Sequence, residues 1–373
     1  MERHSIRIGR LFGIAIRLHV SWLFIFVLLS WTFVAQFTER GAWSNEVCWA
    51  AGLLLSILFF LSVLLHELAH SVVAIDQGMR VRNIVLFIFG GMAEITEEPR
   101  SAGAEFLMSI AGPMMSFAIA AVAGVLWWVT RSLSDPVSVV SLYLAKINLV
   151  LGIFNLIPGF PLDGGRVLRS MIWGATHDVL LATRWATRIG MAVGFLFIAF
   201  GVWQVFFSPS VINGIWMLFI GWFLAGAAHA AHNRALLREA VRDRTVRQVT
   251  PAFPETVAPD LDLASLVDAH VVGRNLRTLP VVENGCLRGL VTIDQLRRVP
   301  RNAWHLTRAV DVMLPADRIR AIHPDAELWT AFEMMNDGET TVLAVIESDG
   351  RFVGLLVRDA VLAQLEAREQ LGL

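Results

Sequence analysis

Long apolar runs dominate the first part of the chain, and they end abruptly near residue 232. A helix needs about 20 apolar residues to cross a lipid bilayer. Six runs reach or approach that length and predict membrane-spanning helices over residues 18–37, 47–75, 104–130, 138–157, 187–207 and 211–231. Residues 1–232 are therefore expected to form a membrane domain, followed by a linker helix over 233–244 and a charged, soluble tail over 245–373.

The composition agrees with this division. The chain is 55% hydrophobic and 17% charged, whereas soluble domains run at roughly 25% charged. The formal net charge of −1 gives no reason to expect a nucleic-acid partner. The two cysteines, Cys48 and Cys286, lie in different kinds of segment, which disfavours a disulfide framework.

The arginines predict the orientation of the membrane domain, because cytoplasmic loops carry an excess of basic residues. Alternate loops are arginine-rich, with Arg3, Arg7 and Arg10 before the first span, Arg80, Arg82 and Arg100 after the second, Arg166, Arg169, Arg184 and Arg188 after the fourth, and Arg234, Arg238, Arg242 and Arg244 after the sixth. The other loops hold only Arg40 and Arg131. We therefore predict a multi-pass protein of the cell membrane with its N- and C-termini in the cytoplasm.

One apolar stretch, residues 81–93, is not typical of a helix. It is rich in β-branched and aromatic residues and contains Gly90-Gly91, which favours a strand followed by a turn. Lipid cannot satisfy an open strand edge, so such a strand must be buried in protein or line a water-filled cavity. A short re-entrant loop is the alternative.

The second predicted span contains three ionisable side chains within five residues, His66, Glu67 and His70. A charged residue in the middle of a membrane helix costs at least about 2.5–3.5 kcal/mol, so the group needs a joint explanation. Positions i and i+4 share a helix face, so the two histidines can offer ring nitrogens to one tetrahedral metal ion. Glu67 lies about 100° around the helix from His66, within reach of a metal-bound water as a general base. A buried polar cluster that stabilises helix contacts is the alternative.

A catalytic zinc usually has three protein ligands, so a third residue is needed. The candidate is Asp163, in the segment Asn155–Gly165 that ends the fourth span. Two prolines break the helix there, and Gly164-Gly165 allows a tight turn. The arginine pattern places this segment and the paired histidines toward the same side of the membrane. An ordinary turn or cap aspartate is the alternative.

With these motifs the sequence resembles the site-2 protease family of intramembrane zinc metalloproteases. The motifs occur in the family's order over about the first 230 residues, namely His66-Glu67-Leu68-Ala69-His70, Phe89-Gly90-Gly91, Gly112-Pro113 and Asn155 through Gly165. The resemblance implies that one Zn²⁺ per chain is bound by His66, His70 and Asp163. It also implies that Glu67 is the catalytic base and that Asn155 holds the substrate or the oxyanion.

The implied activity is hydrolysis of peptide bonds in membrane-anchored proteins near the cytoplasmic face. The resemblance further implies that the strand before Gly90 belongs to a membrane-embedded sheet, which could pair with an unwound substrate by strand addition. Two alternatives remain at this point. One is a membrane transporter or channel regulated by the tail, and the other is an inactive relative that acts as a scaffold. A transporter or channel leaves the cluster of ionisable residues in the second span unexplained. The presence of His66, Glu67, His70 and Asp163 argues against an inactive scaffold.

The soluble tail repeats itself. Leu279–Glu283 matches Leu343–Glu347 at an offset of 64 residues, and Leu287–Val291 matches Phe352–Leu356 at an offset of 65. Each copy predicts helix, strand, turn, strand and helix, over about 245–300 and 308–370. The pair resembles tandem cystathionine-β-synthase (CBS) domains, as in the site-2 protease subgroup that bears them. The fold expected for the whole chain is thus a polytopic α-helical membrane protein with a small β element and a soluble α/β tail.

Nucleotide-binding CBS copies often carry Gly-x-x-Thr-x-x-Asp after the second strand. The first copy has Thr292 but carries Gln295 in the Asp position, and the second copy has Val357 and Ala360 in place of both residues. The pattern disfavours adenine-nucleotide binding. A role in substrate docking or in homodimer formation through the CBS domains fits the tail better.

Overall fold

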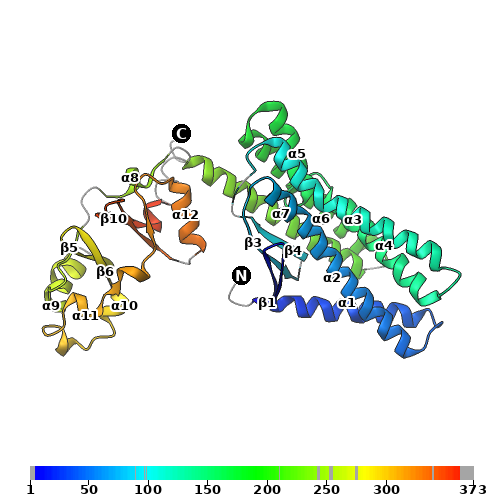
Figure 1. Ribbon diagram of the computed structural model, residues 1–373, viewed down its shortest axis with the longest axis horizontal. Coiled ribbons are helices and arrows are strands. Elements are labelled where there is room, and N and C mark those ends of the chain that lie inside the picture. The colour runs from blue at the N-terminus through cyan, green and yellow to red at the C-terminus, as the bar shows by residue number, and fades with distance from the viewer. Residues whose placement is uncertain are drawn as a thin grey trace. The chain divides into compact units, whose positions relative to one another are not determined.

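The computed structural model describes residues 5–88, 90–95, 97, 99–209, 211–241, 244–251, 255–273, 276–337 and 340–361. The chain divides into two compact units, Met1–Ala235 and Leu236–Leu373. Each unit has its own secondary structure, shown in blue to green for the first and in yellow to red for most of the second (Figure 1).

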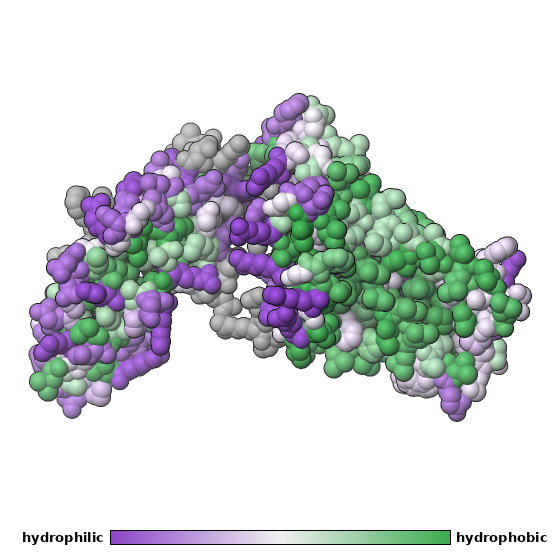
Figure 2. Space-filling model, viewed as in Figure 1, coloured by the Kyte–Doolittle hydropathy of each residue, from purple (hydrophilic) through white to green (hydrophobic). Residues whose placement is uncertain are grey.

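Within the described residues, the first unit contains six helices long and apolar enough to cross a membrane, as predicted. They are α1 (Val20–Glu39), α2 (Asn45–Asp76), α3 (Ala102–Thr130), α4 (Asp135–Asn155), α6 (Val179–Phe207) and α7 (Val211–Ala240). Large apolar side chains remain exposed on them, including Val122, Phe206 and Ile212. Figure 2 shows hydrophobic residues over most of the visible face of this unit. Such a surface needs lipid rather than water around it, which confirms the polytopic membrane fold.

A four-stranded sheet accompanies the helices, in the order β1-β2-β3-β4. The predicted strand corresponds to β3 (Val81–Phe87). Gly90-Gly91, expected to form a turn, instead begin a further strand, β4 (Gly90–Ile95), which was not predicted, and Phe89 of the Phe-Gly-Gly motif lies outside the described residues. The other two strands, β1 (Ser5–Leu11) and β2 (Ile14–His19), were not predicted, and their region was expected to be a charged flank. The available signal was alternation around a two-residue turn, Phe12-Gly13, whose φ angles of 51° and 81° suit a tight hairpin.

The sheet lies against α2 at the level of the paired histidines. Ile14 of β2 and Ile84 of β3 are fully buried with Leu68 of α2. Strands β2 and β3 run parallel, and β4 pairs antiparallel with β3. This packing brings Gly91 of β4 next to the Glu67 side chain.

A further helix, α5 (Asp163–Thr176), follows α4 and was not predicted. Gly164-Gly165, expected to form a tight turn, lies instead in the first turn of α5. The glycines serve close backbone packing, because a Cβ atom at Gly164 would overlap the backbone of Leu156, and one at Gly165 would overlap the backbone of Gly159. The preceding loop is held in turn against α6, where Phe160 N donates to Ala186 O at 3.3 Å.

The second unit contains two three-stranded sheets, in the orders β5-β6-β7 and β10-β9-β8. The strands are β5 (Thr278–Glu283), β6 (Cys286–Thr292), β7 (Leu314–Pro315), β8 (Ala321–Ile322), β9 (Val342–Ile346) and β10 (Phe352–Val357). The helices are α8 (Val246–Val249), α9 (Leu263–Leu266), α10 (Ile293–Leu296), α11 (Ala309–Val312) and α12 (Leu328–Asp337), with a π-helical turn over Val267–Val272 and 3₁₀ turns over Arg301–Ala303 and Ala316–Arg318.

The two halves of this unit exchange their first segments. Val246, at the start of the first copy, packs in the core of the second copy with Leu328 and Leu343. Ala309, at the start of the second copy, packs in the core of the first with Leu279. Each hydrophobic core therefore needs both copies, so the repeat folds as one body.

Candidate metal centre

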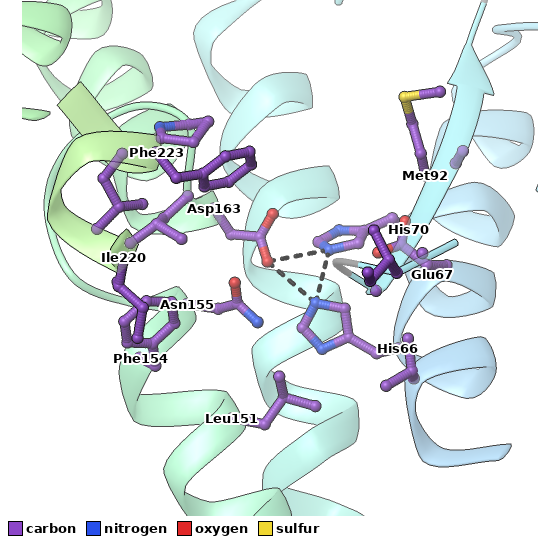
Figure 3. Close-up of a pocket in the computed structure, with 18 of the residues that line it drawn as sticks. His66, Glu67, His70, Met92, Leu151, Phe154, Asn155, Asp163, Ile220 and Phe223 are labelled. Carbon is purple, nitrogen blue, oxygen red and sulfur yellow. Dashed lines mark hydrogen bonds and ion pairs between the residues drawn. The ribbon is translucent and has the colours of Figure 1, made fainter. Parts of the chain in front are cut away.

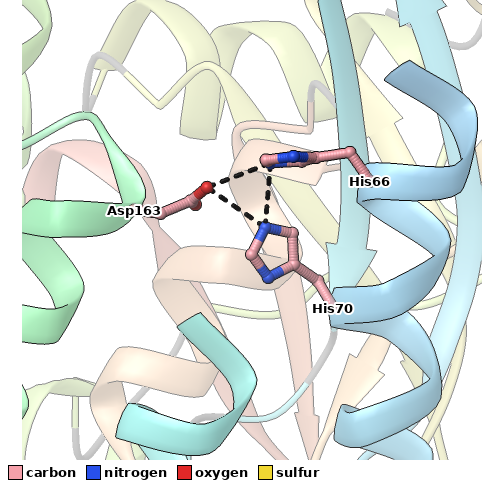
Figure 4. Close-up of side chains that lie close together, drawn as sticks. All are labelled: His66, His70 and Asp163. Carbon is pink, nitrogen blue, oxygen red and sulfur yellow. Dashed lines mark hydrogen bonds and ion pairs between the residues drawn. The ribbon is translucent and has the colours of Figure 1, made fainter. Parts of the chain in front are cut away.

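Three side chains from two distant parts of the chain converge on one point (Figure 4). His66 Nε2 and His70 Nε2 lie 3.1 and 3.2 Å from Asp163 Oδ2, and the two nitrogens are 3.3 Å apart. The histidines lie on α2, one turn apart, and Asp163 is the first residue of α5. Among the described residues, this is the one group of three or more His, Cys, Asp or Glu side chains placed to share a metal ion.

The spacing of these atoms fits a tetrahedral metal ion. Zinc bound at about 2.0–2.1 Å places any two of its tetrahedral ligands about 3.3 Å apart. The three observed separations, 3.1, 3.2 and 3.3 Å, match the edges of such a tetrahedron. Three protein ligands would leave a fourth position open, as in catalytic zinc sites.

Hydrogen bonds behind the rings orient both imidazoles. His70 Nδ1 lies 2.6 Å from Met108 O, and His66 Nδ1 lies 2.9 Å from Ser116 Oγ. A carbonyl oxygen only accepts, so His70 Nδ1 donates, and in the neutral ring Nε2 carries the lone pair that a metal ion would accept. Metal-binding histidines are commonly held by such outer partners. The donor set therefore presents converging lone pairs and one carboxylate, which is chemically suited to Zn²⁺.

The groups that bond to the two imidazoles come from one face of α3. Met108, Gly112 and Ser116 are spaced four residues apart and are all buried. α3 continues as a single helix through Pro113. Gly112 lies directly against the imidazoles, since a Cβ atom there would be 2.6 Å from His66 Nε2 and closer still to His70 Nε2.

Replacing Gly112 with Ala is expected to weaken zinc binding at least about 10-fold, because the added methyl group displaces both imidazoles from their positions. The measurement is zinc affinity by competition with a chelator. Gly124→Ala is the matched control, because it lies on the same helix and a Cβ atom there meets nothing within 4 Å. Unchanged zinc affinity in Gly112→Ala would show that the rings do not need this close contact.

The centre lies in a cavity of about 630 Å³ whose lining includes His66, Glu67, His70, Asn155 and Asp163. The rest of the lining is largely apolar and comes from α1, β4, α4 and α7, for example Ile25, Met92, Leu151, Phe219 and Phe223. Figure 3 shows the Asn155 amide directed toward the space between Asp163 and His66. All five candidate residues from the sequence are thus brought to one cavity.

Glu67 is half-buried at the sheet side of this cavity. A Cβ atom at Gly91 would overlap Glu67 Cγ, so glycine in β4 leaves the room that this side chain occupies. The backbone carbonyl of Glu67 accepts a hydrogen bond from Ser71 Oγ at 2.8 Å. The carboxylate is therefore held next to the imidazoles, between α2 and β4.

Several residues at or near the site were not identified from sequence. Ser116 and Met108 bond to the histidine rings, and Arg166 lines the cavity. Gly112, named from sequence only as part of a family motif, lies against both rings. Asn148, on the same helix as Asn155, donates to Ser62 Oγ at 3.1 Å and joins α4 to α2.

Comparison with known proteins gives consistent matches. Residues 54–140 and 130–200 match Peptidase family M50, and residues 246–302 and 309–367 match the CBS domain. Rip3 of Mycobacterium tuberculosis is 31% identical over 358 residues, which cover 95% of this chain and 91% of the relative. Zinc metalloprotease MJ0392 of Methanocaldococcus jannaschii is 30% identical over 303 residues, covering 79% of this chain and 80% of the relative.

Among solved structures, the site-2 protease from Methanocaldococcus jannaschii is similar at 30% identity, with 61% of this chain and 95% of that chain covered and a TM-score of 0.43. The resemblance inferred from the motifs is confirmed by the family and relative matches. The chain belongs to peptidase family M50, the site-2 proteases, and is a multi-pass membrane metalloprotease that carries tandem CBS domains.

Proposed function

We propose that the chain is an intramembrane zinc endopeptidase that binds one Zn²⁺ through His66, His70 and Asp163 and cleaves membrane-anchored proteins near the cytoplasmic face. The observation that carries the proposal is the convergence of the three donor atoms at 3.1–3.3 Å inside an apolar cavity. Zinc would supply an acidified water and polarise the scissile carbonyl.

The chain's own residues supply the proton transfer. Glu67 accepts a proton from the attacking water and delivers it to the amine that leaves, so one carboxylate serves as base and then as acid. His66 and His70 stay fixed during these steps because Ser116 and Met108 hold their far nitrogens. The apolar lining from α1 and α7 limits water around the reacting bond.

Asn155 is assigned to the developing oxyanion. Its amide is directed at the centre (Figure 3), and an amide N–H can donate to a carbonyl oxygen as negative charge grows there. Its place at the last turn of α4 fixes the side chain on a rigid element.

Replacing Asn155 with Ala is expected to lower kcat for peptide cleavage by about 10²-fold, the usual effect of removing one oxyanion donor. Zinc content should stay at the wild-type value, because none of the metal donors changes. The control is Asn213→Ala, which removes an exposed amide at the start of α7. A kcat equal to wild type would remove Asn155 from the oxyanion role.

The orientation follows from the basic residues. The cytoplasmic face is assigned to the ends of the spans that carry arginines, which places the N- and C-termini in the cytoplasm. The metal centre then lies toward this face, since α5, with Arg166 and Arg169, begins at Asp163. Proteins anchored in the same lipid bilayer are the proposed substrates.

The CBS unit is proposed to regulate the protease or to join two copies. In the first copy, the two positions of the nucleotide-binding pattern contact each other. The Gln295 side chain accepts a hydrogen bond from Thr292 N at 2.7 Å and so closes the helix cap at the position where other copies use Asp for ribose. The Thr292 backbone and the Gln295 side chain are thus engaged with one another.

A cell experiment tests the activity while the substrate is still unidentified. Membrane-anchored proteins are compared between cells with the wild-type chain and cells with Glu67→Gln. At least one uncut anchored protein is expected to accumulate in the variant, with its cytoplasmic fragment lost. Identical sets of anchored proteins and fragments in the two strains would contradict the proposal.

A further inference from the structure

A buried ion pair joins α3 to α5 outside the metal centre. Arg169 Nε donates to Glu105 Oε1 at 2.6 Å, and the Arg169 NH2 group contacts the same oxygen. The Glu105 side chain has no exposed surface, and that of Arg169 is 15% exposed. The pair is thus almost entirely removed from solvent.

A buried ion pair is not explained by stability alone. The cost of taking two charges out of water offsets much of their attraction, and apolar pairs of similar volume often serve folding equally well. What an ion pair adds is direction, because the guanidinium donors fix the position of the carboxylate oxygen. The Glu105–Arg169 pair is therefore expected to orient the helices that carry it.

Glu105 lies on the part of α3 that also holds the two histidines. Glu105 continues the α3 face that supports the histidines, since it lies three residues before Met108 and seven before Gly112. Residues at such spacings share one face of a helix. α3 therefore contacts His66 through Ser116, His70 through Met108, and α5 through Glu105.

Arg169 connects this face to Asp163. It lies on the same helix as Asp163, six residues or about 9 Å along the axis. Its guanidinium also lies 5.6 Å from the centre of the Phe160 ring, in the loop that leads into α5. Arg169 thus holds both the helix that begins at Asp163 and the loop before it.

We propose that Glu105 and Arg169 are positioning residues that set the distance between the Asp163 carboxylate and the paired imidazoles. α2 carries two of the three donors and α5 carries the third, so the site is complete only when these helices keep a fixed separation. α3 touches both, and the ion pair fixes its contact with α5. This inference rests on the proposed zinc function.

The test replaces both charges together in the full-length protein. Glu105→Leu combined with Arg169→Met removes both charges of the pair together, so the thermal unfolding temperature of the metal-free protein should stay near the wild-type value. Zinc affinity is expected to fall about 10- to 100-fold, the range for outer partners of metal ligands. The visible absorption of the cobalt-substituted protein should change as well, because it reports the ligand geometry.

Two further variants complete the design. Arg169→Lys keeps the charge but loses the forked donors, so its zinc affinity should lie between those of the wild type and the double variant. Arg184→Met removes an exposed arginine of α6 and should leave zinc affinity unchanged. Should the double variant fail to fold, Arg169→Lys decides.

The outcomes separate the two proposals. A wild-type chain that binds no zinc contradicts the metal centre itself. A wild-type chain that binds zinc, together with a folded double variant of equal affinity and equal cobalt spectrum, contradicts the positioning role. Wild-type affinity and spectrum in Arg169→Lys contradict it when the double variant does not fold.

Discussion

Replacing Glu67 with Gln is expected to reduce peptide cleavage by about 10²- to 10⁴-fold, the range that positioned acid–base groups contribute. Gln keeps the length and shape of the side chain, so its contact with Gly91 in β4 persists. The amide cannot accept the proton of the attacking water, and this loss alone accounts for the expected defect.

The zinc content of Glu67→Gln should equal that of the wild type, because the three donor atoms are untouched. Cleavage is measured with the purified chain in lipid, on a substrate that accumulates in the variant strain, and metal is measured by elemental analysis. Glu46→Gln, at the exposed start of the same helix, is the matched control. Cleavage within tenfold of wild type would exclude Glu67 as the base.

Replacing Asp163 with Asn is expected to lower zinc affinity by more than about 100-fold, beyond the 10- to 100-fold range for an outer partner. Asn preserves the size of the side chain but removes the negative charge that faces both Nε2 atoms at 3.1 and 3.2 Å. The metal ion would then meet only neutral ligands from the three positions.

The measurement for Asp163→Asn is zinc affinity by chelator competition, followed by the cleavage assay with zinc in excess. Asp178→Asn is the control, because Asp178 caps α6 by accepting from Leu181 N and asparagine caps helices equally well. Zinc affinity equal to wild type in Asp163→Asn would mean that the third ligand is another group, and the assignment of this site would be wrong.

The effects of the two variants differ in a useful way. Glu67→Gln separates catalysis from metal binding, whereas Asp163→Asn removes both. A chain in which neither variant changes zinc content or cleavage would not use this centre. The adjacent positions of Glu67 and His66 on α2 make the contrast sharp, since a disturbance of the helix would affect both readouts together.

Local features of the fold were accessible from sequence. Membrane spans depend on the length of an apolar run, and the six predicted runs all correspond to helices. Most of their ends differ by a few residues. α6 begins at Val179 rather than 187, because its first two turns mix polar and apolar residues, and α7 continues to Ala240, into the segment predicted as a linker helix. The strand at 81–87 was visible from its β-branched residues, but the hairpin of β1 and β2 was hidden by its arginines.

The site itself was accessible only in part. The spacing of His66, Glu67 and His70 fixes their relation on any helix, because one turn separates i from i+4. Asp163 was found as a candidate by its segment and by family resemblance. On α3, Gly112 was visible as part of a family motif, but Ser116 and Met108 left no recognisable pattern, since a serine hydroxyl and a backbone carbonyl are common in any span.

The sequence by itself determined the six membrane spans, the paired histidines and the duplicated tail, because each depends on residues close together along the chain. Only the tertiary structure decided that Asp163, 97 residues after His66, meets both rings, and that α3 holds the two sides of the centre in place. The physical reason is that these distances depend on how helices pack, and packing is set by the shapes of many side chains at once.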